Sequence, residues 1–192
     1  RFVRVPDNVV DHIKPWTSLD QHYEFAHQKL EMMHSEWTIA LQHQDVEHFV
    51  RGNYVRLFID NKIDQKFAQA FFEAMKSDCV LHRYMEYNDL TNYMYGSAVV
   101  VWLMMNRLMW VDNVQADEYA KKLGEAMQLT NFLRDIKEDY LELWRIYVPE
   151  DVLSEYGLSH QTIIDFCMKK IDYESAERKK HIECMKNLIG RC

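Results

Sequence analysis

Apolar residues recur every three to four positions along most of the chain, and this spacing predicts a succession of helices. The first is expected to run from residue 1 to about residue 14, where Pro15 ends it. Thr17 or Ser18 can cap a second helix that reaches about Gln42.

The rest of the chain continues this helical pattern. Further helices are expected at residues 45–58, 64–74, 88–109, 114–143, 149–157 and 159–189. Residues 78–87 are expected to be irregular, and Asp112-Asn113 to form a turn. Because no strand, repeat or linker is evident, the sequence predicts one all-α domain spanning residues 1–192.

The amino-acid composition supports this fold class and argues against one class of function. The chain has 192 residues with only 5 Gly and 3 Pro but 11 Met, which favours long helices. Its net charge of −7 argues against a nucleic-acid partner.

The cysteines and the apolar runs indicate the compartment. Without CxxC spacing, the four cysteines favour a reducing cytoplasm over a disulfide framework or a zinc site. No apolar run approaches the ~18 residues of a membrane span, and peripheral membrane contact is left open. The chain starts at Arg1 without Met, so we expect segments of a longer protein to be missing at both ends.

A polar stripe stands out on the helix expected at 114–143. Residues three and four apart share a helix face, so Gln128, Asn131, Asp135 and Asp139 form one line. The apolar residues that border this line are Ala120, Met127, Phe132 and Ile136. Such borders favour a polar strip in an otherwise apolar cavity over a solvated face.

Paired aspartates on one helix face suggest a cation. Two carboxylates four residues apart repel by roughly 0.2–0.5 kcal/mol, and Mg²⁺, which prefers oxygen ligands, would offset this cost. The first helix has a similar pattern, with Arg4 preceding Asp7 and Asp11. Carboxylates that hold metal beside arginines suit a diphosphate substrate, although spacing alone leaves solvated helix faces as an alternative.

Three segments of the sequence resemble motifs of a known protein family. The segment QLTNFLRDIKED at 128–139, followed by RIYVPED at 145–151, resembles the second signature of the squalene/phytoene synthase family. RVPDNVVD at 4–11 resembles its first aspartate motif, and YMYGSA at 93–98 resembles its tyrosine-rich middle helix. The three motifs occur in the family's order.

This resemblance implies an isoprenoid-synthase-type helical bundle around a central cavity. It implies that two farnesyl or geranylgeranyl diphosphates condense head to head through a cyclopropyl diphosphate. The product would be of squalene or phytoene type, in isoprenoid, carotenoid or triterpenoid biosynthesis. The expected cofactor is Mg²⁺, with Mn²⁺ as a substitute, while the use of NADPH, the oligomeric state and the prenyl chain length are left open.

The resemblance also implies roles for individual residues. The expected metal ligands are Asp7, Asp11, Asn131, Asp135 and Asp139. The expected diphosphate and substrate contacts are Arg4, Arg134, Gln128, Tyr93, Arg145 and Tyr147, the last two on a flap. The two acidic motifs are expected to face one another across a dry pocket.

Three residues depart from the family's pattern. Val99 and Trp102 stand where relatives usually have small residues, so Trp102 either shortens the prenyl channel or packs in the core. Asn8 replaces an acidic residue that often follows the first aspartate.

Two other functions remain as alternatives. A chain-elongating prenyl synthase or terpene cyclase also uses Mg²⁺, but its first motif has adjacent aspartates, unlike Asp7-Asn8. A non-enzymatic binding or assembly protein would suit a cavity filled by Val99 and Trp102. Retention of all four aspartates argues against it, because like charges on one face would then lack a purpose.

Overall fold

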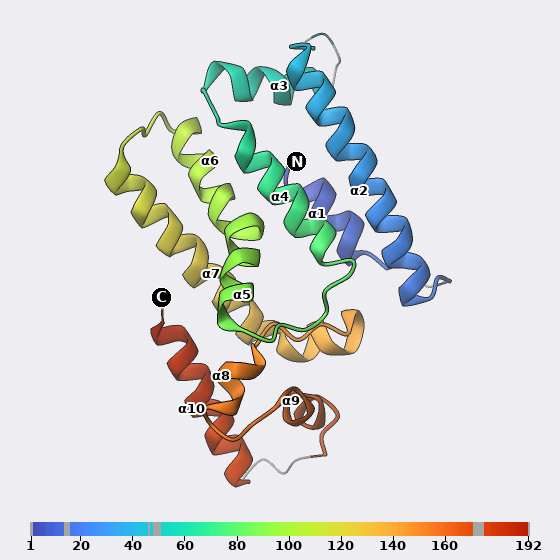
Figure 1. Ribbon diagram of the computed structural model, residues 1–192, viewed down its shortest axis with the longest axis vertical. Coiled ribbons are helices and arrows are strands. Elements are labelled where there is room, and N and C mark those ends of the chain that lie inside the picture. Colours follow the sequence, from blue (N-terminus) through green and yellow to red (C-terminus); the bar gives the residue numbers. More distant parts are fainter. Residues whose placement is uncertain (1, 14–15, 46, 48–50, 171–174, 192) are drawn as a thin grey trace. The chain divides into compact units, whose positions relative to one another are not determined.

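The computed structural model describes residues 2–13, 16–45, 47, 51–170 and 175–191, without the side chains of residues 51 and 52. The chain divides into two compact units, one made of residues 1–80 and 95–124 and the other of 81–94 and 125–192. All regular elements in the described ranges are helices, which confirms the predicted all-α class (Figure 1). The expected single domain over residues 1–192 stays a prediction.

The first unit contains six helices and the start of a seventh. They are α1 (Arg4–Asp11), α2 (Leu19–Gln42), α3 (Arg51–Asp60), α4 (Gln65–Ser77), η1 (Tyr95–Val99), α6 (Val100–Leu108) and the beginning of α7 (Val114–Leu143). Local capping explains two of these starts. Ser18 and Gln21 form a capping box at α2, and the Asp64 carboxylate accepts from the amide of Lys66 at α4.

Two predicted helix bounds in this unit are wrong. The first helix is shorter than predicted, because α1 begins at Arg4 and ends at Asp11. The third begins at Arg51 rather than Asp45: Gln44 has φ +51° and the Asp45 amide donates to the carbonyl of Ala40, so both residues close α2. Residues 46 and 48–50 of the predicted helix lie outside the described ones.

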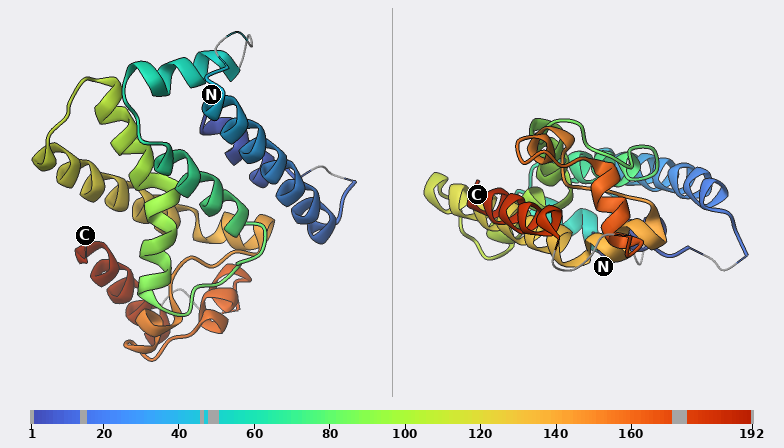
Figure 2. Two further views of the ribbon diagram at one scale, coloured as in Figure 1. Left: turned by 45° about the horizontal axis from the view of Figure 1, so that its top comes forward. Right: turned by 90° about the horizontal axis from the view of Figure 1, so that it is seen from below.

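Helix α4 lies between α2 and the helical stretch formed by η1 and α6 (Figures 1 and 2). It buries Phe67, Phe71 and Phe72 in the core of the unit. A Cβ added at Gly96 would lie 2.5 Å from the Ala70 carbonyl oxygen, so only glycine allows η1 to approach α4 this closely. Phe2 extends this core through ring contacts with Trp37 and Phe58.

Among its described residues, the second unit contains four further helices and the rest of α7. They are α5 (Tyr87–Met94), α8 (Glu150–Ser154), α9 (His160–Cys167) and α10 (Ala176–Gly190). The single helix predicted over 159–189 is wrong. Lys169 has φ +56°, which breaks the helix after Cys167, and the Ser175 hydroxyl caps a new helix by accepting from the amide of Arg178.

The helix predicted at 88–109 follows α5, η1 and α6 in turn, and η1 is a π-helical stretch. Short π-helical stretches are rare and frequently occur at functional sites. Within the described part of the chain, no helix combines the length and the apolarity that crossing a bilayer requires.

Candidate active site

The predicted polar stripe lies on α7, within its portion in the second unit. Asp135 and Asp139 are one turn apart and both are half-buried, with 29% of the Asp135 side chain exposed. Gln128 is also half-buried, whereas Asn131 is exposed. Four side chains whose oxygen atoms could bind a cation therefore lie along one face of α7, as predicted.

Arg134 binds its neighbour Asp135 through two hydrogen bonds. Its Nε donates to Oδ1 at 2.7 Å and its Nη2 to Oδ2 at 2.5 Å. This hydrogen bonding from Arg134 lowers the pKa of Asp135 below its usual value, although partial burial acts in the opposite direction. The carboxylate is therefore ionised at neutral pH, which is the form that binds a cation.

Four buried rings form an aromatic cluster beside this stripe: Tyr84, Tyr93, Phe132 and Tyr147. Phe132 stacks on Tyr147 with centroids 4.0 Å apart, and Tyr147 also stacks on Tyr93 at 5.6 Å and on Tyr84 at 5.8 Å. Tyr84 lies in the segment 78–87, which was expected to be irregular. Its stacking on Tyr147, 63 positions later in the chain, is not revealed by helix periodicity.

Arg145 and Tyr147 were predicted to lie on a flap, and both side chains are buried in the second unit. The Nη1 of Arg145 donates to the hydroxyl of Tyr147 at 3.4 Å. The backbone here runs beside residues 82–85, since Ile146 and Tyr84 take part in hydrogen bonds between the two segments. The two residues thus belong to an ordered wall of the unit.

His160 also hydrogen-bonds to this wall, a role that sequence analysis missed. Its Nε2 donates to the carbonyl of Val148 at 2.9 Å, and its amide donates to Oε2 of Glu150 at 2.7 Å. The ring is buried. A histidine at the first helical position carries no sequence signal for such a long-range contact.

The first aspartate motif lies on α1, in the other unit. Pro6 and Val10 are its buried residues, whereas Arg4, Asp7 and Asp11 are exposed. The Val10 carbonyl is 2.7 Å from Nε2 of His22, which ties α1 to α2. The expectation that this motif faces Asp135 and Asp139 stays a prediction.

The two departures from the family's pattern lie on η1 and α6. Val99 is buried with 1% exposure. Trp102 is half-buried, so its indole retains an accessible part. Both residues remove space that a small residue would leave.

The oxygen-bearing side chains on α7 are of the kind that binds a magnesium ion. Among the described residues, no three His, Cys, Asp or Glu side chains gather as a metal-binding group. Mg²⁺ does not require such a cage, because it is usually held by one or two carboxylates together with waters and substrate phosphates. Asp135 and Asp139 supply two carboxylates on one face, and Asn131 adds an amide oxygen.

Comparisons with known proteins identify the family of this chain. Residues 1–178 match the profile of the squalene/phytoene synthase family. The chain is 45% identical over 84 residues to a 15-cis-phytoene synthase of Enterobacter agglomerans, covering 43% of this chain and 28% of that protein. It is 32% identical over 134 residues to a 4,4'-diapophytoene synthase of Staphylococcus haemolyticus, covering 69% of this chain and 43% of that protein.

A solved structure shows the same fold. The crystal structure of the squalene synthase HpnC from Alicyclobacillus acidocaldarius matches with a TM-score of 0.69 at 19% identity. The match covers 99% of this chain and 68% of that one. It confirms the expected squalene synthase-type helical fold.

Proposed function

Because this chain belongs to the squalene/phytoene synthase family, we propose that it carries out the head-to-head condensation of two prenyl diphosphates. The substrates would be farnesyl or geranylgeranyl diphosphate, and the product would be of squalene or phytoene type. One observation carries the proposal: the carboxyl groups of Asp135 and Asp139 lie on the same helix as Phe132, which stacks in a buried aromatic cluster. A charged diphosphate and a reactive carbocation need these two environments.

Binding begins at the acidic stripes. Asp135 and Asp139, with Asn131, would hold Mg²⁺, and Asp7 and Asp11 on α1 would supply a second set of ligands. When bound, Mg²⁺ neutralises the diphosphate and makes it a better leaving group. Arg134 lowers the pKa of the Asp135 carboxyl and would share a phosphate oxygen of the bound diphosphate.

The proposed reaction releases one inorganic diphosphate in each of its two ionisation steps. The C1–O bond of one allylic diphosphate breaks, and its electron pair leaves with inorganic diphosphate. The double bond of the second substrate attacks the allylic cation, and loss of a proton closes a cyclopropane ring. The cyclopropyl diphosphate then ionises and rearranges, and the final cation loses a proton or accepts a hydride from NADPH.

The aromatic cluster would stabilise these cations. Tyr93 and Tyr147 belong to this cluster, and the negative quadrupole of aromatic rings attracts positive charge. Gln128, half-buried about two turns before Asp135, would lie near the reacting carbons. Buried aromatic walls also exclude water, which would otherwise quench the cation.

The direct test is incubation of the purified protein with farnesyl or geranylgeranyl diphosphate and Mg²⁺, with and without NADPH. Mass analysis should detect a linear C30 or C40 hydrocarbon. Asp135→Asn should lose turnover but keep its helical circular dichroism, whereas Glu142→Gln, an exposed change on the same helix, should retain it. Absence of such a hydrocarbon with both substrates would contradict the proposal.

The same assay separates the alternatives. A longer diphosphate or a cyclic terpene would identify an elongating synthase or a cyclase. The assembly-protein alternative is favoured by one observation, the burial of Val99 beside Trp102 in place of small residues. It would be supported if a farnesyl diphosphate analogue failed to bind in the presence of Mg²⁺.

A further inference from the structure

His160, the first residue of α9, binds the residue that directly follows Tyr147. Its ring Nε2 lies 2.9 Å from the carbonyl oxygen of Val148. A carbonyl oxygen can only accept, so this ring nitrogen carries the proton of the bond. Both residues are buried, with 6% of His160 and 1% of Val148 exposed. Water therefore cannot easily take the place of either partner.

Glu150 fixes His160 in turn. Its Oε2 accepts from the backbone amide of His160 at 2.7 Å and lies 3.2 Å from Nδ1 of the same ring. The backbone amide of Glu150 donates to the carbonyl of Tyr84 at 3.0 Å. His160 thus contacts Val148 and Glu150, the residues on both sides of Pro149.

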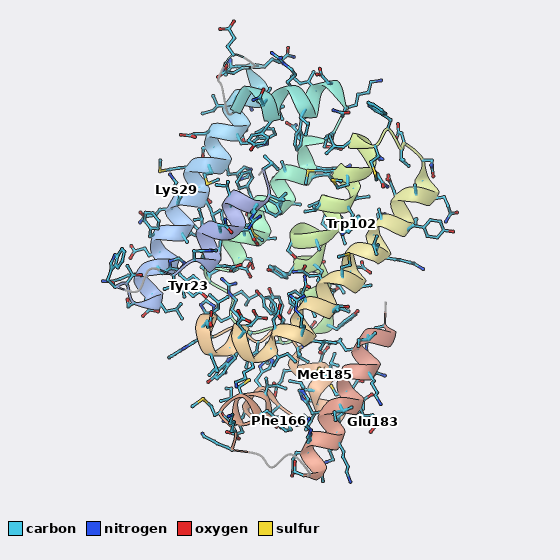
Figure 3. All side chains as sticks on the ribbon, turned by 180° about the vertical axis from the view of Figure 1, so that it is seen from behind. Tyr23, Lys29, Trp102, Phe166, Glu183 and Met185 are labelled. Carbon is cyan, nitrogen blue, oxygen red and sulfur yellow. The ribbon has the colours of Figure 1, made fainter. Side chains whose placement is uncertain are left out.

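The rest of α9 gives His160 a fixed base. The Ser159 hydroxyl caps the first turn of the helix by accepting from the amide of Thr162. At the other end, the ring of Phe166, labelled in Figure 3, packs on the ring of His181 in α10, with centroids 4.8 Å apart. Because α9 is anchored at both ends, a side chain on its first residue can hold the wall in place.

Loss of the bond from α9 would affect Tyr147 through the backbone. The Val148 carbonyl would remain buried without this donor, which is costly, and its peptide could regain a partner only by turning. Turning this peptide displaces Tyr147, whose ring stacks on Phe132 at 4.0 Å. Since Tyr147 also stacks on Tyr84 and Tyr93, the displacement would loosen the whole aromatic cluster.

We propose that His160 is a positioning residue for the condensation, an inference that rests on the proposed function. Through the carbonyl of Val148 it keeps Tyr147 stacked in the aromatic cluster, whose rings stabilise the carbocation. It therefore acts on the rate of the ionised steps. Binding of the diphosphate depends instead on the acidic stripes and their arginines.

The first test needs no turnover. NMR of protein with carbon-13-labelled tyrosine records the ring signals of Tyr147, assigned by their loss in Tyr147→Phe, and these signals report its stacking on Phe132. His160→Leu should shift them, because the Val148 carbonyl loses its donor. His160→Gln should keep them near their wild-type positions, because the glutamine amide can donate to the same carbonyl.

A matched control separates this effect from general loosening. His22→Leu removes another buried ring whose Nε2 lies 2.7 Å from a backbone carbonyl, that of Val10 in the other unit, and should leave the Tyr147 signals unchanged. Glu150→Ala is a second variant if the leucine form of His160 does not fold. It removes the carboxylate beside His160 but keeps the backbone amide, and it should move the same signals.

Turnover then tests the role in the reaction. His160→Leu should lower kcat about tenfold but change KM by less than about twofold, because the rings are displaced while the groups that hold the diphosphate are not. His160→Gln should recover most of the lost kcat. A merely structural role would lower the amount of folded enzyme without this recovery.

The outcomes separate this inference from the function beneath it. Unchanged Tyr147 signals in His160→Leu and Glu150→Ala, an equal shift in His22→Leu, or a loss confined to KM would overturn the positioning role while the proposed function stands. If the wild type made no hydrocarbon from either diphosphate, both would fall. Shifted signals together with a loss of kcat that glutamine recovers would support the positioning role.

Discussion

The rings of Phe132 and Tyr147 lie nearly parallel, 12° apart in plane and 4.0 Å apart in centroid. This stacking joins α7, which carries the acidic stripe, to the segment that carries Arg145. Tyr147 holds two further rings, so Phe132 supports the whole aromatic cluster. A substitution of Phe132 should therefore also affect the packing of the other rings in the cluster.

Phe132→Ala should lower the free energy of unfolding by about 3–5 kcal/mol, because it removes a buried ring and leaves a cavity beside Tyr147. Urea denaturation followed by circular dichroism measures the change. Met127→Ala on the same helix, at a side chain that is 47% exposed, should change stability by less than about 0.5 kcal/mol. Equal effects of the two substitutions would contradict the role of Phe132.

Arg134→Gln should raise the pKa of the Asp135 carboxyl towards its usual value, because the hydrogen bonds from Arg134 are what lower it. Carbon-13 NMR of the carboxyl during an acid titration measures this pKa. Since the folded-state pKa is lowered, the pair contributes stability above the usual value of 3.8 and loses it as pH falls through the folded pKa. An unchanged titration in the variant would show that Arg134 does not hold Asp135 in solution.

Gly96→Ala should destabilise the protein by about 1–3 kcal/mol through overpacking, because the added methyl group meets Ala70 and Ala74 of α4. Gly190→Ala is the matched control, since its added methyl group meets nothing within 4 Å. That control should be neutral or stabilising by up to about 1 kcal/mol, as alanine favours a helix. Denaturation midpoints of the two variants give the comparison, and a loss at Gly190 equal to that at Gly96 would be inconsistent with it.

Cys184 should resist alkylation in the folded protein. Burial, aided by the negative charge of Glu155, raises the pKa of its thiol to about 11. At pH 8 its thiolate is then roughly a hundredfold scarcer than that of an ordinary cysteine, and the side chain is fully enclosed. Iodoacetamide labelling mapped by mass spectrometry should modify Cys184 only after urea is added; rapid labelling without urea would exclude this environment.

Sequence rules for helix periodicity and helix capping predicted much of the fold. Ser18 and Asp64 are caps whose signal lies within three residues, and both open helices as predicted. The errors occurred where a chain reversal overrides periodicity, as at Gln44 and Lys169, which both adopt positive φ. Neither residue is glycine, so nothing in the sequence marked these breaks.

The site was predictable in part. The spacing of Asp135 and Asp139 on one helix face could be obtained from the sequence, because both belong to one helix. The contacts of Tyr84 and His160 could not, since each joins residues of different elements: Tyr84 stacks on Tyr147, and His160 of α9 hydrogen-bonds to Val148, which precedes α8. The roles of Arg4, Asp7 and Asp11 follow from the resemblance and stay predictions.

The pairing of residues 82–85 with 146–151 bears on synthesis at the ribosome. The carbonyls of His82, Tyr84 and Met85 accept from the amides of Ile146, Glu150 and Asp151. These acceptors emerge some sixty residues before their donors, and a long stretch of the other unit is translated in between. Water must therefore solvate these carbonyl groups until residues 146–151 have been synthesised, so this wall cannot form before then.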